Sequence, residues 1–135
     1  MASGSDLMIP ASTLILARDV ASGPPELLML ERANVMRFAA GALVFPGGRL
    51  DDDDMALAIE LAHGRDEDVE DIASRIAAIR ETIEETGIAI GIDPIPDGAT
   101  VAELRAALAE GATFSRLMSD AGLRPALDAL TLYTR

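Results

Sequence analysis

The sequence predicts one mixed α/β domain, in which a group of strands is followed by helices. Its 135 residues are enough for a single domain with a modest core. Before residue 46 the chain carries short apolar segments rich in branched side chains, and after residue 50 its apolar residues recur at helical spacing. Only three Phe and one Tyr are present, so we expect an aliphatic core.

The N-terminal third is expected to contain three strands. They lie at residues 12–18, 26–31 and 41–45. Gly23, Pro24 and Pro25 mark a loop between the first two, which we therefore expect to pair as a hairpin. Pro46 is followed by Gly47 and Gly48 after the third strand. This combination predicts an irregular turn, at which the backbone can come close to a ligand or a metal.

The four acids at residues 51–54 have two interpretations. Carboxylates at the start of a helix bind free backbone N–H groups and suit the helix dipole, which predicts a helix over residues 55–63. A Ca²⁺ or Mg²⁺ site is the alternative. Residue type and position favour the helix start. His63, the only histidine, stands before Gly64 and is expected to be exposed at the end of this helix.

A long amphipathic helix that ends at Gly87 is the main candidate for function. Its apolar positions alternate by three and four and predict a buried face, namely Val69, Ile72, Ile76, Ile79 and Ile83. Glu81, Glu84 and Glu85 share another face of the helix. Hard divalent cations prefer such oxygen clusters, although a solvated acidic face is the alternative. Arg80 can pair with Glu84 one turn later.

The C-terminal third predicts shorter elements. Residues 88–92 are expected to form another strand. Thr100 and Glu103 have the spacing of a capping box and predict the start of a helix there. A further short helix is expected over residues 113–121, whereas the amphipathic residues 123–135 are ambiguous.

Composition argues against several classes of function. Cysteine is absent, which excludes disulfides, thiolate metal sites and cysteine nucleophiles. The formal net charge of −12 argues against binding to a nucleic acid polymer or an anionic membrane, although metal ions can bridge a phosphate substrate to carboxylates. No apolar run is as long as a membrane span, and no signal-peptide pattern is present. We therefore expect a soluble cytoplasmic protein.

Two motifs together resemble the signature of the Nudix hydrolases. R-E-x-x-E-E-x-G-U (U apolar) occupies residues 80–88, and F-P-G-G precedes it at residues 45–48. Members of that family cleave diphosphates linked to another moiety, using Mg²⁺ or Mn²⁺. The resemblance implies an α/β/α sandwich with a mixed sheet, and a small-molecule diphosphate as substrate.

The same resemblance implies roles for individual residues. Glu81, Glu84 and Glu85 would bind the metal and carry catalysis. Gly47 would offer its backbone carbonyl to a metal, and Arg80 would orient the carboxylates through a salt bridge. The ions would lower the pKa of bound water, which attacks a phosphorus of the diphosphate. Which glutamate is the general base stays open.

The segment before the glycine pair points to a substrate. Residues 27–48 resemble the coenzyme A motif of Nudix enzymes, L-L-T-x-R-[SA]-x-x-L-R-x-x-x-G-x-V-x-F-P-G-G. Arg32 and Arg37 match in register and, with Gly47 and Gly48, are expected to bind substrate, because guanidinium groups bind phosphates bidentately. Solubilising or salt-bridged arginines are the alternative. Four positions depart from the motif: Met29, Leu30, Met36 and Leu43.

The implied reaction is hydrolysis of coenzyme A or acyl-coenzyme A to 3′,5′-ADP and (acyl-)4′-phosphopantetheine. Two rival functions stay open. One is a Nudix pyrophosphatase acting on another nucleoside diphosphate derivative, such as ADP-ribose or a dinucleotide polyphosphate. The other is a non-catalytic Nudix-fold binding or assembly module.

Two departures from the family pattern accompany the resemblance. Arg80 follows Gly48 by 32 positions instead of 14, which implies an insertion at about residues 51–68 inside a single domain over residues 1–135. Asp54 stands where the first Glu of the box would fall when counted from Gly48. An interrupted box resembles the acyl-coenzyme A diphosphatases, whose chains continue further. The chain is therefore expected to be C-terminally truncated, or to be completed by a partner such as a second copy in a homodimer.

Overall fold

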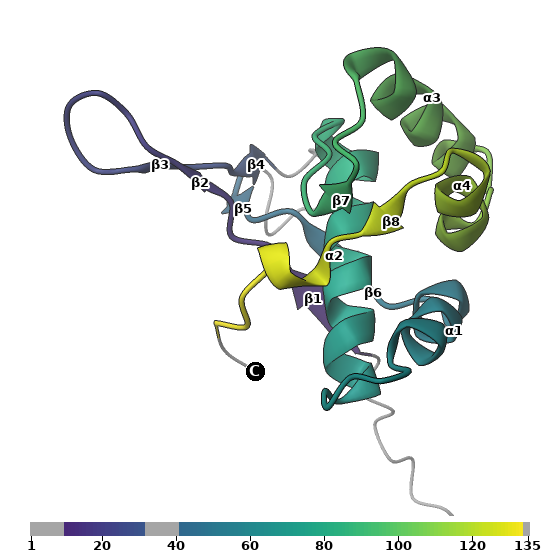
Figure 1. Ribbon diagram of the computed structural model, residues 1–135. Helices are drawn as coiled ribbons and strands as arrows, with labels where there is room; N and C mark the ends of the chain where they lie inside the picture. Colours follow the sequence, from purple (N-terminus) through teal and green to yellow (C-terminus); the bar gives the residue numbers. More distant parts are fainter. Residues whose placement is uncertain (1–9, 32–40, 134–135) are drawn as a thin grey trace, which may run out of the picture.

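The computed structural model describes residues 10–31 and 41–133, and one long helix lies at the centre of this part (Figure 1). Its helices are α1 (Asp52–Leu61), α2 (Val69–Thr86), α3 (Gly98–Ala109), α4 (Phe114–Asp120) and the short 3₁₀ helix η1 (Leu127–Ala129). Its strands are β1 (Ala11–Thr13), β2 (Ala17–Arg18), β3 (Glu26–Leu27), β4 (Leu30–Glu31), β5 (Leu43–Val44), β6 (Gly47–Arg49), β7 (Ile92–Asp93) and β8 (Arg124–Pro125). In Figure 1, α1, α3 and α4 lie on one side of α2, and β2 to β5 lie on the other.

Helix α2 forms because its apolar positions fall on one stripe that the core covers. Ile72, Ile76, Ile79 and Ile83 are fully buried. Gly87 ends the helix with a φ of 71°, in the left-handed region that glycine adopts without strain. The predicted helix and its end are confirmed.

Helix α1 begins at the acidic run, as predicted. Asp51 Oδ1 accepts a hydrogen bond from the backbone N–H of Asp54 at 2.8 Å, and Asp54 Oδ2 accepts one from the N–H of Asp51 at 2.9 Å. This reciprocal pair is a capping box, so the helix-start interpretation of the four acids is confirmed. His63 is exposed, as expected.

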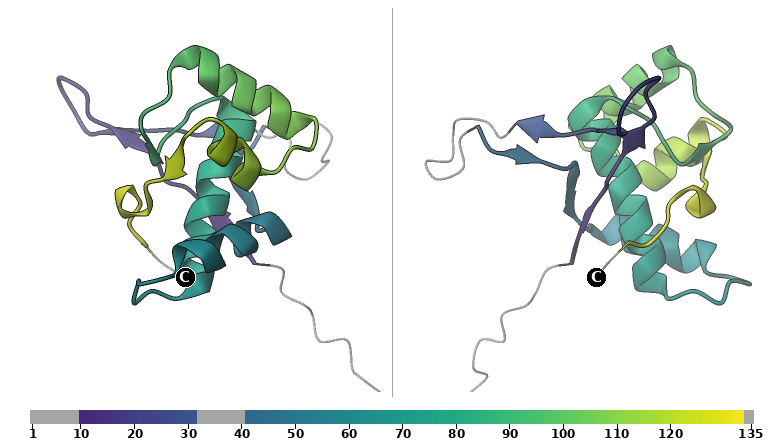
Figure 2. Two further views of the ribbon diagram at one scale, coloured as in Figure 1. Left: turned by 45° about the vertical axis from the view of Figure 1, so that its right-hand side comes forward. Right: turned by 90° about the vertical axis from the view of Figure 1, so that its left-hand side faces the viewer.

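Each of the first two predicted strands is split in two, because each changes its partner midway. Residues 11–13 pair with β6, whereas β2 pairs with β3. The second stretch likewise pairs first with β2 and then, through β4, with β5. The β2–β3 hairpin is confirmed, and it projects from the helical part in Figure 1 and in the left view of Figure 2.

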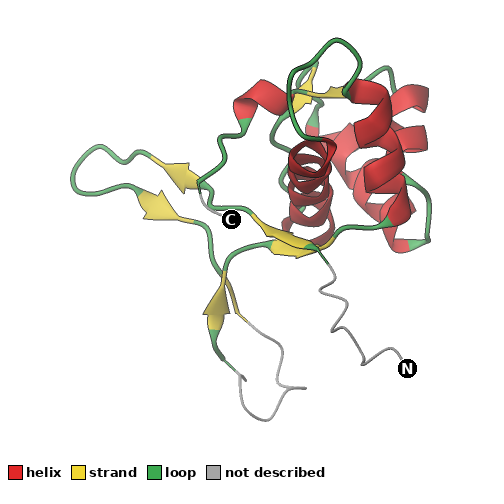
Figure 3. Cartoon of the chain, turned by 90° about the horizontal axis from the view of Figure 1, so that it is seen from below, coloured by secondary structure: helices red, strands yellow, loops and turns green. Residues whose placement is uncertain are grey.

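The paired strands of the described residues form four two-stranded antiparallel ladders, and not the single mixed sheet that we expected. Figure 3, which looks along α2, shows the β1–β6 ladder beside this helix. Each ladder contains two or three residue pairs. The mixed α/β class itself is confirmed.

Three local predictions are wrong. Gly47 and Gly48 do not form an irregular turn, since both are extended residues of β6 with no positive φ. Of residues 88–92, only the last joins β7. The capping box at Thr100 is absent because Asp97 Oδ1 accepts the Thr100 N–H at 2.8 Å, so the N-cap of α3 is Asp97, three residues earlier. The short helix before Gly122 is confirmed as α4.

The core is aliphatic with one exception. Helices α1, α3 and α4 add Leu57, Leu104, Leu108 and Met118 to the isoleucines of α2, and Phe114 is the aromatic side chain in the cluster. In both views of Figure 2, α3 lies toward one end of α2 and α1 toward the other. None of the helices within residues 10–31 and 41–133 has the length and apolar character needed to cross a membrane.

Candidate functional site

The candidate site lies where the last two turns of α2 face β6. The carboxyl group of Glu81 lies against Gly48, where a Cβ would come within 2.5 Å of its carboxyl carbon. Glu85 lies close to the backbone of Gly47 and to the side chain of Glu81, which both lower its pKa, although burial raises this pKa overall. The two glycines therefore allow the strand to approach the glutamates closely. The structure brings together four of the residues that the sequence singled out.

The backbone groups of Gly47 are directed away from β1. Leu14 donates its N–H to the carbonyl of Pro46 at 2.8 Å, which marks these two as a hydrogen-bonded pair of the β1–β6 ladder. Because such pairs alternate with non-bonded ones in an antiparallel ladder, Gly47 makes no ladder bonds to β1. Its N–H and C=O point to the side on which Glu85 lies. The β1–β6 ladder therefore does not use the Gly47 carbonyl.

Arg80 binds two of the three glutamates and also the acid Asp54. Its Nε and Nη2 donate to the two carboxylate oxygens of Asp54 at 3.0 and 2.8 Å, and Nη2 also donates to the carbonyl of Arg49 at 3.0 Å. Its Nη1 donates to Glu81 at 3.0 Å and to Glu84 at 3.2 Å. The predicted Arg80–Glu84 ion pair is confirmed. The guanidinium therefore binds Asp54 bidentately, and its Nη1 donates to the two glutamates of α2.

Asp54 is the residue whose role the sequence reasoning missed. Its side chain is fully buried and accepts both from Arg80 and from the α1 cap. The available signal was its position counted from Gly48, which put an acid where the Nudix box has one. Asp54 binds the arginine of the box, and the acidic run it belongs to starts a helix.

Burial and crowding change the ionisation of these groups. Burial raises the pKa of Asp54, and its bonds to Arg80 offset only part of this rise. Burial would lower the pKa of Arg80, but the hydrogen bonds and charge of Asp54 outweigh it and raise this pKa, so the guanidinium stays protonated. Burial raises the pKa of Glu81 to about 7, and the neighbouring charges of Glu84 and Glu85 add to the rise.

The donor set has the chemistry that a divalent cation requires. In the part of the chain that the structure describes, no three His, Asp or Glu side chains surround a common point, and Arg80 donates to both Glu81 and Glu84. Three carboxylates nevertheless crowd on one face, and a hard cation would offset their repulsion. The hydroxyl of Ser12 is buried without a partner opposite Gly48, on the face of the ladder that meets Glu81.

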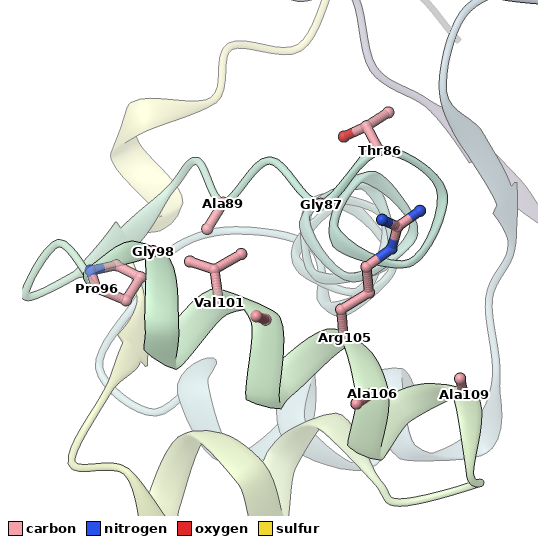
Figure 4. A pocket seen from close by; sticks show the side chains of 10 residues that line it. Thr86, Gly87, Ala89, Pro96, Gly98, Val101, Arg105, Ala106 and Ala109 are labelled. Carbon is pink, nitrogen blue, oxygen red and sulfur yellow. The ribbon is translucent and has the colours of Figure 1, made fainter.

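Two hollows in the surface of the described residues lie elsewhere. One of about 640 Å³ lies between the end of α2 and α3, where Arg105, Gly87 and Val101 line it (Figure 4). The other, of about 220 Å³, lies at the β2–β3 hairpin. The three glutamates line neither of them. Arg32 and Arg37, which the sequence singled out for substrate binding, lie outside the described residues.

Alanine at the two glycines is expected to have different effects. Gly48→Ala meets the flexible end of Glu81, which can move, so we expect a stability change within about 1 kcal/mol but a displaced carboxylate. Gly47→Ala meets the backbone of β1, including Thr13 Cα at 2.8 Å, and is expected to cost about 1–3 kcal/mol. Urea unfolding of both variants checks this order. Equal stability losses would contradict the placement of β6.

The comparisons with known proteins bear on the fold. No protein-family model matches the chain. A solved structure, the NUDIX hydrolase from Alicyclobacillus acidocaldarius, is similar with a TM-score of 0.64 and 32% sequence identity. The match covers 87% of this chain and 56% of that protein, so the chain spans little more than half the length of this neighbour. The fold is that of a Nudix hydrolase, and the neighbour supports the resemblance to the Nudix superfamily.

Proposed function

We propose that the chain carries the metal-binding part of a Nudix hydrolase that cleaves the diphosphate of coenzyme A or acyl-coenzyme A. The observation that carries this proposal is that Glu81 and Glu85 lie against β6 at Gly48 and Gly47, while Glu84 shares the guanidinium of Arg80 with Glu81. The similarity to a NUDIX hydrolase over most of the chain supports it.

The three glutamates and the carbonyl of Gly47 would hold Mg²⁺ or Mn²⁺. A bound ion would lower the pKa of a water molecule and neutralise charge that develops on the phosphate oxygens. Arg80 forms ion pairs with Glu81 and Glu84, which hold both side chains in place and compensate part of their negative charge. Because Asp54 binds one edge of the guanidinium through both of its carboxylate oxygens, Arg80 cannot turn toward solvent without breaking a buried ion pair.

The substrate assignment rests on the coenzyme A motif. We propose that Arg32 and Arg37 bind its phosphates, because guanidinium groups suit phosphate geometry. Helix α1 and its connector to α2 correspond to the proposed insertion at residues 51–68. The Asp54–Arg80 pair ties this insertion to the glutamates, which gives it a structural role at the site.

Product identification tests the proposal. The protein is incubated with Mg²⁺ or Mn²⁺ and with coenzyme A, acetyl-coenzyme A, ADP-ribose or diadenosine tetraphosphate, and the products are identified by mass spectrometry. We expect 3′,5′-ADP and phosphopantetheine from coenzyme A, and none with a chelator present. Cleavage of ADP-ribose or diadenosine tetraphosphate, with neither coenzyme A nor acetyl-coenzyme A cleaved, would contradict the coenzyme A assignment. A folded protein that cleaves none of them would favour a non-catalytic binding module.

A further inference from the structure

The last turn of α2 lacks part of its own hydrogen bonding. The carbonyls of Glu84 and Glu85 need N–H donors four residues later, beyond Gly87, where the helix has already ended. The first of these donors, Ile88 N–H, bonds instead to Thr86 Oγ1 at 3.1 Å. Two of the proposed metal ligands therefore sit in a turn whose carbonyls must find donors elsewhere.

Arg105 of α3 supplies these donors. Its Nε donates to the carbonyl of Glu84 at 3.1 Å, and its Nη2 donates to the carbonyl of Glu85 at 3.2 Å. Gly87 makes room for the guanidinium, since a Cβ there would lie 3.3 Å from Nη1. Figure 4 shows the Arg105 side chain reaching from α3 to the end of α2, beside Thr86 and Gly87.

The charge of Arg105 matches its position. The carbonyl end of a helix carries partial negative charge, which a cation stabilises. Helix α2 has no basic residue in its own last turn, so Arg105 places a positive charge there from another helix. Arg105 directly follows the buried Leu104, and Leu108, one turn after Leu104, is also buried. Helix α3 is therefore packed against the core at this point.

We propose that Arg105 is a positioning residue for the glutamate cluster. Arg105 fixes the backbone of Glu84 and Glu85 and thereby the direction of their carboxylates. In a helix the backbone sets where each Cα–Cβ bond points, so a frayed last turn would misplace both carboxylates. The inference rests on the proposed function, because it assigns Arg105 to the metal site of that function.

The test compares Mn²⁺ affinity in wild type, Arg105→Ala and Arg105→Lys by titration calorimetry. We expect Arg105→Ala to weaken Mn²⁺ binding about tenfold, in the range typical of residues that support metal ligands. Arg105→Lys is expected to recover part of this loss, since an ammonium can donate to one carbonyl but lacks the bidentate fork. Amide hydrogen exchange at residues 84–88 should become faster in Arg105→Ala.

Arg116→Ala is the matched control, because this exposed arginine of α4 pairs with Asp120 on its own helix. It should leave Mn²⁺ affinity unchanged. Wild-type protein that binds no Mn²⁺ would overturn the proposed function and this inference with it. If wild type binds Mn²⁺ and Arg105→Ala binds it equally well, the inference alone is overturned. An equal loss in Arg116→Ala would also overturn it.

Discussion

Replacing Glu84 with glutamine is expected to lower metal-dependent hydrolysis at least about 100-fold while the protein stays folded. Glutamine keeps the shape of the side chain but removes the charge that would hold the ion. The fold depends little on this group, because the Glu84 side chain is 32% exposed and Arg80 keeps its bonds to Asp54 and Glu81. Initial rates with coenzyme A and Mg²⁺, alongside circular dichroism, measure both effects.

Glu70→Gln is the matched control for this change. Glu70 is an exposed glutamate in the first turn of the same helix, so its replacement alters the net charge equally but lies far from β6 along α2. It should retain wild-type turnover. Near wild-type turnover in Glu84→Gln would show that Glu84 is not a metal ligand.

The second large effect is expected in stability. Asp54→Asn should lower the free energy of unfolding by about 3–5 kcal/mol, because it leaves the guanidinium of Arg80 buried without its main counter-charge. The Asp54 side chain is fully buried, and that of Arg80 is only 6% exposed. The same change weakens the α1 cap, in which Asp54 accepts the N–H of Asp51. Urea denaturation followed by circular dichroism gives the change in midpoint.

Asp52→Asn serves as the comparison for this stability effect. Asp52 is the exposed acid two residues earlier in the same helix turn, so its replacement removes the same charge without touching Arg80. We expect a change within about 0.5 kcal/mol. If Asp54→Asn proved as stable as Asp52→Asn, the buried pair would not hold α1 against α2.

Features that depend on local pattern could be predicted from the sequence. The helix that carries Glu81 and Glu84 follows from apolar residues spaced by three and four, and its end follows from Gly87. The start of α1 follows from the acidic run before it. These signals lie within a few residues of the feature that they specify, so no tertiary contact is needed to find them.

Features that depend on distant partners could not be predicted in this way. The glycine pair suggested a turn, but Gly47 lies opposite Thr13 in an extended strand, and the absence of a side chain at Gly48 is what lets the carboxyl group of Glu81 lie against that strand. Nothing in the local sequence around Arg105 indicates that it reaches the end of α2. Which strands pair, and which distant groups an arginine side chain contacts, is determined by the packed fold.

Competition between nearby polar residues also limits the prediction. Thr100 and Glu103 have the spacing of a capping box, yet Asp97 is also a good N-cap residue and lies three residues before Thr100. The structure uses Asp97, whose carboxylate accepts the Thr100 N–H. The sequence contained both signals, and only the packed helix decides between them.

The most direct test of the account is Mn²⁺ binding, followed by loss of the electron paramagnetic resonance signal of free Mn²⁺ as protein is added. The central claim is that Glu81, Glu84 and Glu85 together hold a divalent ion. Wild-type protein should therefore bind Mn²⁺, and Mg²⁺ should compete for it. The triple glutamine variant at these positions should bind none while retaining its fold. Equal Mn²⁺ binding by the triple variant, or none by wild type, would contradict the account.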